Sequence, residues 1–358
     1  MLTILVLSLL VLLHELGHFL VAKLFGIHVE EFGIGLPPKA LKLFKHKETE
    51  YTLNWLPIGG FVRLAGEETD PTLWERINPL THSHMFFAKP AWQRALVIVA
   101  GVTMNFLIGI LMFSAVYAKM GIPQFAGEQV MVTEVASDSP AEIAGMKAGE
   151  VVVKVGDTEI KKADDFVSIV KEHQGEMISV YLAKVDSNGL KSDSARIVEV
   201  IPRVNPPAGQ GALGVGVSTV PIVTYIKKAW YEAPFYGAIE GTKEAVAWSR
   251  EFLKIFMHPA ELLKNMGGPV AVVKVGQTAA KEGWVTMARF AGIISLNLAI
   301  FNLLPIPALD GGRLLMIALE KIIGRKRVVK FERYANGVGM FLLIALLIGV
   351  TVKDLFFS

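Results

Sequence analysis

Four stretches of the chain are apolar enough to span a membrane. They cover residues 2–25, 95–118, 290–309 and about 338–352. A helix rises about 1.5 Å per residue, so about 20 apolar residues cross a hydrocarbon layer of roughly 30 Å. Pro305 and Pro307 interrupt the third stretch, so we expect a broken span there, and the short fourth stretch should extend back through Ala335. The pattern predicts a polytopic α-helical membrane protein with about four transmembrane helices.

The segment between the first two spans alternates β-like runs with turn-forming residues. The runs are residues 29–34, 40–44, 51–56 and 60–64. The turn formers between them are Gly35, Pro37, Pro38, Pro57 and Gly59. Residues such as Trp55 and Phe61 are too apolar for a free loop. We therefore expect either a small sheet on the membrane surface or a re-entrant hairpin at membrane depth.

A more polar segment follows the second span and is typical of an inserted domain. Its strand-like runs are residues 130–132, 151–155, 178–185 and 196–201. After it, residues 225–258 and 260–281 have the pattern of amphipathic helices, with a break at Gly267-Gly268-Pro269. We therefore divide the chain into an N-terminal membrane part, an inserted domain, a helical linker and a C-terminal membrane part. Their bounds are residues 1–126, with a β-loop at 28–66, then 127–220, 221–284 and 285–358.

The composition agrees with a mixture of membrane and polar parts. The 358 residues are 52% hydrophobic and 19% charged, too apolar for an ordinary soluble chain and too charged for one wholly in lipid. The net charge of +3 gives no reason to expect a nucleic-acid partner. Without any cysteine, the chain has no disulfide, no Cys-ligated zinc and no thiol nucleophile.

Basic residues concentrate in two of the connections between spans. They crowd residues 321–333 and recur through residues 23–94. Short loops rich in Lys and Arg stay on the cytoplasmic side of a membrane. We therefore expect both of these loops in the cytoplasm, and both termini and the inserted domain outside.

The first span carries the sequence His14-Glu15-Leu16-Gly17-His18. Residues four apart share one face of a helix, so both imidazoles can reach one metal ion, with Glu15 beside them as general base. HExxH also arises by chance, and an apolar N-terminus can be a signal peptide. This one has no basic residue before its apolar run and no small-residue cleavage site after it. Ionisable side chains at membrane depth are costly and usually mark a functional site.

The broken third span supplies a candidate third ligand within residues 302–312, of sequence NLLPIPALDGG. Irregular backbone at membrane depth is tolerated where it lines a cavity or is buried in protein, and it can turn the Asp310 carboxylate inward. Alternatively, Asp310 caps a following helix over residues 313–323. The two roles do not exclude each other. Two imidazoles and one carboxylate leave a zinc ion one open position for water.

The HExxH motif in the first span and Asn-x-x-Pro-x-x-x-x-Asp-Gly in the third resemble the site-2 protease family of intramembrane metalloproteases. Gly101 and Asn105 match the family's Gly-x-x-x-Asn in the second span, although Val102 stands where a proline is common. The resemblance implies a zinc metalloendopeptidase with one Zn²⁺ per chain. The implied metal ligands are His14, His18 and Asp310. The implied catalytic acid/base is Glu15. The implied substrate-binding residues are Asn302, Pro305, Asn105, Gly59, Gly60 and Phe61.

Residues 137–150 of the inserted domain resemble the bacterial PDZ signature, with Ser-Pro-Ala, Ala-Gly-hydrophobic and Gly-acidic elements before a strand. Residues 211–217 resemble its carboxylate-binding loop, placed at the end as in circularly permuted α/β PDZ domains. The implied groove residues are Gly211, Leu213, Gly214, Val215 and Gly216. Peptides add to such grooves as an extra strand. The other interpretation is a β-domain that only blocks access.

With the PDZ insertion, the chain resembles the regulator of sigma-E protease branch, although the best-known members carry two PDZ domains. This implies a multi-pass protein of the bacterial inner membrane, in contact with lipid, that cleaves transmembrane segments of single-span proteins. The expected substrates are pre-trimmed anti-sigma factors or leftover signal peptides, and peptide C-termini are candidate PDZ ligands. The rival hypothesis is a membrane-anchored PDZ scaffold with a vestigial metal site. A zinc transporter is disfavoured because no second-half repeat matches the HExxH motif.

Overall fold

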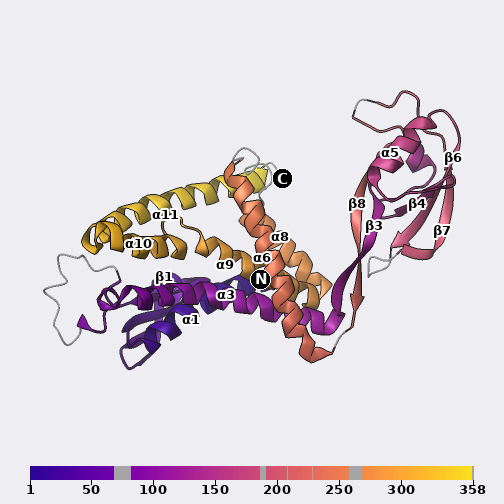
Figure 1. Cartoon of the computed structure of the whole chain (residues 1–358). Helices are drawn as coiled ribbons and strands as arrows, with labels where there is room; N and C mark the ends of the chain where they lie inside the picture. Colours follow the sequence, from indigo (N-terminus) through magenta and orange to yellow (C-terminus); the bar gives the residue numbers. More distant parts are fainter. Residues whose placement is uncertain (68–81, 186–190, 208, 228, 258–267, 357–358) are drawn as a thin grey trace. The chain divides into compact units, whose positions relative to one another are not determined.

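The structure, a computed structural model, describes residues 1–67, 82–185, 191–207, 209–227, 229–257 and 268–356. The chain divides into two compact units (Figure 1). Unit 1 is formed by Met1–Lys119 together with Ala229–Ser358, and unit 2 by Met120–Lys228. Unit 1 is built mainly from helices, whereas unit 2 is built mainly from strands.

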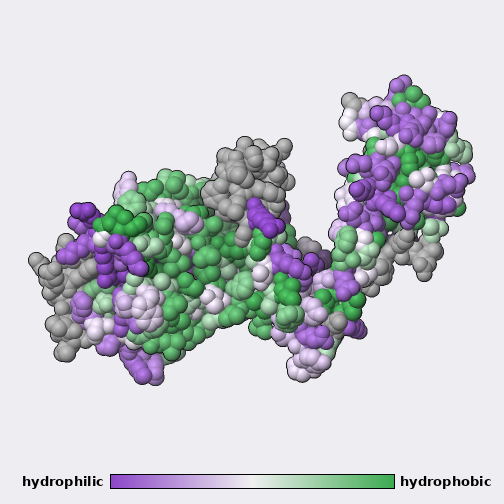
Figure 2. All heavy atoms as spheres, in the orientation of Figure 1, coloured by the Kyte–Doolittle hydropathy of each residue, from purple (hydrophilic) through white to green (hydrophobic). Residues whose placement is uncertain are grey.

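Four helices of unit 1 are long and apolar enough to cross a membrane: α1 (Leu2–Leu24), α3 (Ala91–Met120), α9 (Trp284–Leu303) and α11 (Arg325–Phe356). The four spans predicted from the sequence are thus present among the described residues. Large apolar side chains remain exposed on them, among them Leu5 at 66%, Leu111 at 60% and Phe341 at 71%. Figure 2 shows the resulting broad hydrophobic surface of this unit. Such a surface suits contact with lipid rather than water.

The third and fourth spans differ from their predicted bounds. α9 begins at Trp284 rather than at residue 290 and ends at Leu303, so the predicted break lies outside the helix. Leu304 is extended, because the residue before a proline is disfavoured in the helical conformation. α11 begins at Arg325, well before Ala335. Its first turns mix basic and apolar residues, and a search for purely apolar stretches misses an amphipathic start.

The described residues of unit 1 also form the α-helices α6 (Ala233–Met257), α8 (Pro269–Glu282) and α10 (Asp310–Ile323). The helix expected from residue 225 begins only at Ala233, after the short helix η3 (Trp230–Glu232), since the chain is still a strand up to Ile226. α8 begins at Pro269, where a proline is preorganised for the first helical turn. Residues 258–267, which include the end of the first expected helix and the start of the second, lie outside the described residues.

The β-loop of unit 1 consists of β1 (Val29–His46) and β2 (Thr49–Leu64), followed by the short helix η2 (Phe86–Ala88). Both strands are bent, and their pairings place four segments side by side. Phe32 pairs with Val62 on one side and with Tyr51 on the other, and Phe44 pairs with Tyr51 from beyond. The order across the sheet is therefore residues 60–64, 29–34, 50–53 and 41–46. These segments correspond to the four runs predicted from the sequence, with Gly35 and Gly59 at positive φ in the bends.

Unit 2 is an antiparallel sheet with the order β7-β6-β4-β3-β8, and β5 pairs with β4. Its elements are β3 (Ile122–Val135), α4 (Pro140–Ile143), β4 (Val151–Val155), β5 (Thr158–Glu159), α5 (Ala163–Glu172), β6 (Ile178–Val185), β7 (Lys191–Val200) and β8 (Val215–Ile226). Val130, Phe166, Leu182 and Leu213 belong to its buried core. The predicted strands are all present. β3 extends well beyond residues 130–132, because it pairs with β8 along nearly its whole length.

Candidate metal centre and active site

His14 and His18 project from one face of α1 into the interior of unit 1. They are 6% and 8% exposed, and their Nε2 atoms lie 3.1 Å apart. The spacing of four residues places the two rings side by side, as the motif predicts. Two neutral imidazole nitrogens that face each other in this way offer lone pairs to one shared partner.

Asp310 brings a carboxylate to the same point from the far end of the chain. Its Oδ2 lies 3.1 Å from His14 Nε2 and 3.3 Å from His18 Nε2. α10 begins at Asp310 itself rather than at Arg313, with Leu309 as N-cap and no capping hydrogen bond from a side chain. The capping role considered for Asp310 is therefore wrong, because its carboxylate is turned towards the histidines rather than towards the helix.

The two glycines after Asp310 explain how the helix can start so abruptly. A Cβ on Gly311 would lie 2.2 Å from the carbonyl oxygens of Leu303 and Leu304. One on Gly312 would lie 2.3 Å from the carbonyl oxygen of Ile306. Contacts this short are not seen for real side chains, so only glycine lets the first turn of α10 pack against the preceding loop. The Asp-Gly-Gly sequence thus places the Asp310 carboxylate.

The three ligand atoms have the spacing that a zinc ion requires. Their separations are 3.1, 3.1 and 3.3 Å. In a tetrahedral site with bonds of about 2.0–2.1 Å to nitrogen and oxygen, neighbouring ligands lie about 3.3 Å apart. Asp310 Oδ2 is buried and has no hydrogen-bond partner among the described residues. In that part of the chain, His14, His18 and Asp310 are the one cluster of three such ligands, so the residues fit a catalytic zinc site.

The other ring nitrogens of both histidines have partners of their own. His18 Nδ1 lies 2.8 Å from the carbonyl oxygen of Val97, and His14 Nδ1 lies 3.2 Å from Asn105 Nδ2. Asn105 Oδ1 is buried without a partner among the described residues. Turning the amide by half a rotation lets Oδ1 accept the Nδ1 hydrogen of His14, the partner that a metal-binding imidazole needs. Asn105 therefore orients His14 and does not line the pocket described below.

Gly101 makes room for the two rings. A Cβ at this position would lie 2.3 Å from His18 Nε2 and 2.8 Å from His14 Cε1. On the other helix, a Cβ on Gly17 would lie 2.4 Å from the carbonyl oxygen of Ala100. These two glycines let α1 and α3 approach closely, as small residues do between membrane helices. The Gly-x-x-x-Asn motif of the second span thus serves the histidines of the first.

Glu15 and Asn302 lie beside the three ligands. Glu15 Oε2 accepts a hydrogen bond of 3.2 Å from the backbone N–H of Val62. Asn302 Nδ2 lies 3.4 Å from His14 Nε2, at the end of α9. Pro305 follows the end of that helix and terminates it. The site therefore has two polar side chains beside the metal ligands: the Glu15 carboxylate, with its Oε2 held by a hydrogen bond, and the Asn302 amide.

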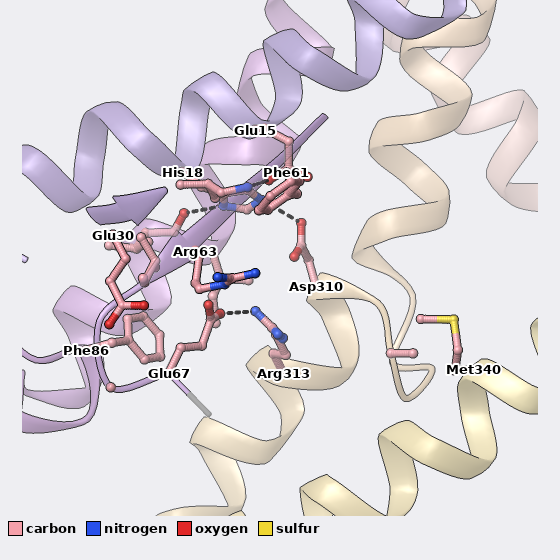
Figure 3. Close-up of a pocket in the computed structure, with 16 residues that line it drawn as sticks. Glu15, His18, Glu30, Phe61, Arg63, Glu67, Phe86, Asp310, Arg313 and Met340 are labelled. Atoms are coloured by element: carbon pink, nitrogen blue, oxygen red, sulfur yellow. Dashed lines mark hydrogen bonds and ion pairs between the residues drawn. The ribbon is translucent and has the colours of Figure 1, made fainter. Parts of the chain in front are cut away.

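A cavity of about 680 Å³ opens beside the metal ligands (Figure 3). Figure 3 shows Phe61 and Glu15 close to His18, with Asp310 facing them and Arg313 below. Phe61 lines the cavity, whereas Gly59 and Gly60 pack against Val11 and Leu12 of α1. The volume lies within the usual range of ligand-binding pockets.

Charged residues that the sequence analysis did not single out line the same region. Arg313 pairs with Glu67 beside the cavity. In an adjoining cavity, which Arg313 and Glu67 also line, Arg94 pairs with both carboxylate oxygens of Glu320, at 2.8 and 2.5 Å. Arg313 follows Asp310 by three residues and therefore lies on the same face of α10, a spacing that could have pointed to it. The pairing of Arg94 with Glu320 joins residues far apart in the sequence and left no local signal.

Of the predicted groove residues of unit 2, Gly211, Leu213 and Gly214 precede β8, and Val215 and Gly216 are its first two residues. A smaller cavity of about 240 Å³ is lined there by Gly211, Leu213 and Val215, opposite Phe166 and Val170 of α5. Gly214 adopts φ +72°, and Gly216 pairs with Glu134 of β3. Neither of these two glycines lines the cavity.

An HExxH helix and a carboxylate from a second apolar segment, buried together, define a metallopeptidase-type site in a membrane protein. The chain belongs to Peptidase family M50, the site-2 protease family, whose model matches residues 2–346. It is 35% identical over 353 residues to a Clostridium perfringens protein provisionally named a zinc metalloprotease, covering 98% of this chain and 96% of the relative. It is also 32% identical over 360 residues to the chloroplastic membrane metalloprotease ARASP of Arabidopsis thaliana, covering 98% and 77%. The family resemblance and the zinc metalloprotease class inferred from the sequence are confirmed.

Proposed function

We propose that this protein is an intramembrane zinc endopeptidase that cleaves transmembrane segments of single-span proteins. The observation that carries the proposal is the cluster of two buried histidines, His14 and His18, with the half-buried Asp310, and with Glu15 beside it. His14, Glu15 and His18 all stand on α1, which is apolar enough to span a membrane, and Asp310 begins α10, which follows the span α9. Water-soluble peptidases have no need to bury such a site among lipid-exposed helices.

Each site residue has a role in this reaction. Zinc, when bound to His14, His18 and Asp310, supplies a Lewis acid that activates water and polarises a peptide carbonyl. Glu15 keeps Oε2 on the N–H of Val62, which leaves Oε1 to take a proton from water and pass it to the leaving amine. Asn302, 3.4 Å from His14 Nε2, is placed to donate a hydrogen bond to the substrate backbone.

The segment of residues 60–64 is the part of the sheet that we propose holds the substrate. It pairs with residues 29–34 on one side, and the N–H of Val62 points to Glu15 on the other. A helical substrate hides its carbonyls in hydrogen bonds, so it must unwind before cleavage. Strand addition to this edge would present an unwound segment to the metal, with Phe61 against it in the cavity. Exposed residues at the bend, Trp55 at 70% and Ile58 at 53%, suit insertion of the sheet into lipid.

We further propose that unit 2 is a circularly permuted PDZ domain of the sigma-E protease type. An apolar cavity lies between α5 and β8, beside the loop with Gly214, where a peptide C-terminus would bind. Such a domain outside the membrane would exclude bulky ectodomains and admit trimmed stumps. Pre-trimmed anti-sigma factors and leftover signal peptides are the two substrate classes that fit this role.

The proposed topology places both termini and unit 2 outside a bacterial inner membrane. The β-loop and the basic first turns of α11 would then face the cytoplasm. Single cysteines at Ser168 and Lys326 test this in a chain that has no other cysteine. An impermeant thiol reagent should label the first site from outside and the second only after the membrane is opened. Labelling of both sites from one side would contradict the topology.

The substrate is best identified by capture with Glu15→Gln, which should bind substrate without turning it over. Trapped single-span proteins with shortened external domains, including anti-sigma factors, would support the sigma-E type role. Trapped signal peptides would indicate membrane clearance instead. Capture of intact, folded ectodomain proteins alone would favour the rival function, a PDZ scaffold with a vestigial metal site.

A further inference from the structure

The loop that carries Asp310 contains an unusual backbone conformation. Ala308, two residues before the ligand, has φ +72°. Left-handed backbone is disfavoured for residues with a Cβ, and a non-glycine residue keeps it only where its surroundings hold it there. The loop between α9 and α10 therefore needs an external support to present the carboxylate.

The support comes from α11, the fourth span. Asn336 Oδ1 accepts a hydrogen bond of 2.9 Å from the backbone N–H of Ala308. Gly339, three residues further along and so on the same face of α11, lies against Pro307. A Cβ on Gly339 would lie 2.7 Å from the Pro307 carbonyl oxygen and 2.8 Å from its Cβ. Asn336 and Gly339 of α11 therefore contact two consecutive residues of the loop, Ala308 and Pro307.

The same helix also fixes the element that follows Asp310. Val328 and Ala335 of α11 form a buried cluster with Met316 of α10. The loop and the body of α10 are thus both held against α11, and Asp310 lies between the two contacts. Asn336 is a polar residue in a helix that is otherwise apolar enough to span the membrane, where such a side chain needs a specific partner.

We propose that Asn336 is a positioning residue of the zinc site. It holds Ala308 in the left-handed conformation and thereby keeps Asp310 Oδ2 within reach of His14 and His18. This inference rests on the proposed role of Asp310 as a metal ligand. The fourth span is then a structural support of the metal centre as well as a membrane anchor.

Zinc affinity of the purified full-length protein, measured by competition with a chromogenic chelator, tests this inference. Asn336→Ala should weaken zinc binding about 10- to 100-fold, the usual effect of losing a residue that orients a ligand. It should also change the visible absorption spectrum of the Co²⁺-loaded protein, which reports ligand geometry. Asn336→Asp, which keeps an oxygen acceptor at the same place, should retain most of the affinity. Gly337→Ala is the matched control, because a Cβ there meets no other atom of the described chain within 4 Å.

Rescue separates positioning from general damage to the fold. Adding Ala308→Gly to Asn336→Ala should recover much of the lost affinity, because glycine adopts φ +72° without strain. Wild-type affinity in Asn336→Ala, or a loss that Ala308→Gly does not relieve, would overturn the inference. Asp310→Asn identifies the source of a failure. If that variant also binds zinc normally, the metal role of Asp310 fails, and if it alone loses zinc, only the role of Asn336 fails.

Discussion

Two carboxylates that are largely shielded from solvent, one in each unit, serve different purposes. The side chain of Glu150 in unit 2 is 7% exposed, and that of Asp310 in unit 1 is 14% exposed. Glu150 accepts hydrogen bonds from Arg196 Nε at 2.9 Å, from Arg196 Nη2 at 2.8 Å and from the N–H of Lys147 at 2.8 Å. Its burial is fully compensated inside the protein, so its role is to stabilise the fold.

The Asp310 carboxylate, unlike that of Glu150, lacks such compensating hydrogen bonds on its Oδ2 atom within the described part of the chain. Its Oδ2 has no hydrogen-bond partner among the described residues and faces two imidazole nitrogens that are themselves metal ligands by type. A buried polar group without a partner is costly and rare, and it persists where a ligand supplies what the chain does not. The comparison predicts that changes at Asp310 affect metal and activity, whereas changes at Glu150 affect stability.

The largest expected effect separates the two carboxylates directly. Asp310→Asn should reduce bound zinc from about one ion per chain to almost none and abolish cleavage, because it removes one of three protein ligands. Glu150→Gln should leave zinc content and cleavage unchanged. Metal analysis and cleavage of a single-span substrate in detergent check both variants. Zinc retained by Asp310→Asn would contradict the assignment of the site.

Glu15 sharpens the comparison within the site, because it is a third carboxylate whose role is in chemistry rather than in binding. Glu15→Gln should lower the cleavage rate by about 10²- to 10⁴-fold, the range lost with a general base. It should leave zinc content at the wild-type value, since Glu15 contributes no ligand atom to the cluster. Full activity in this variant would contradict the proposed mechanism.

Removal of zinc should destabilise unit 1 and leave unit 2 unaffected. Binding to the folded state alone stabilises it by about 2.7 kcal/mol when free zinc is 100 times its dissociation constant. Chelation should therefore lower the unfolding temperature of the wild-type protein but not that of Asp310→Asn. Calorimetry of both proteins with and without chelator measures this difference, and an equal shift in the two would show that the effect does not arise at the ligand site.

The smallest effect is a pH dependence confined to unit 2. Burial acts to raise the pKa of Glu150, but the hydrogen bonds from Arg196 and Lys147 outweigh it, so the pKa lies below its ordinary value. A lowered folded-state pKa contributes stability that is present above the ordinary pKa and is lost as the pH falls through the folded value. Glu150→Gln should cost about 1–3 kcal/mol at neutral pH.

This prediction is tested by comparing how the stability of unit 2 changes with pH in the wild type and in Glu150→Gln. Below about pH 5, the wild-type unfolding transition of unit 2 should fall more steeply than that of Glu150→Gln, because only the wild type gains a proton at this site on unfolding. Calorimetric scans of the full chain between about pH 3 and 7 compare the two. Parallel slopes would mean that Glu150 is not the group responsible.

Periodicity and motif spacing predicted the parts of this protein that depend on neighbours in the chain. The four spans, the β-like runs and the pairing of His14 with His18 follow from local geometry. The predicted bounds failed where long-range contacts decide them. β8 takes residues 215–226 because it pairs with β3, although part of this segment also suits a helix. α11 extends back to Arg325 although its first turns are amphipathic rather than apolar.

The sequence by itself determined the type of site, because HExxH on a helix fixes two ligands and a base through a repeat of four residues. It could name Asp310 only as a candidate, from the broken third span and by resemblance, since a carboxylate nearly three hundred residues away has no geometric relation to His14 until the chain folds. Only the tertiary structure brought Asp310 Oδ2 within 3.1 Å of His14 Nε2. It also revealed the supports of the site, Gly101 behind the two rings and Asn336 beneath the loop. These contacts join separate helices, and packing between helices is not encoded in the periodicity of any one of them.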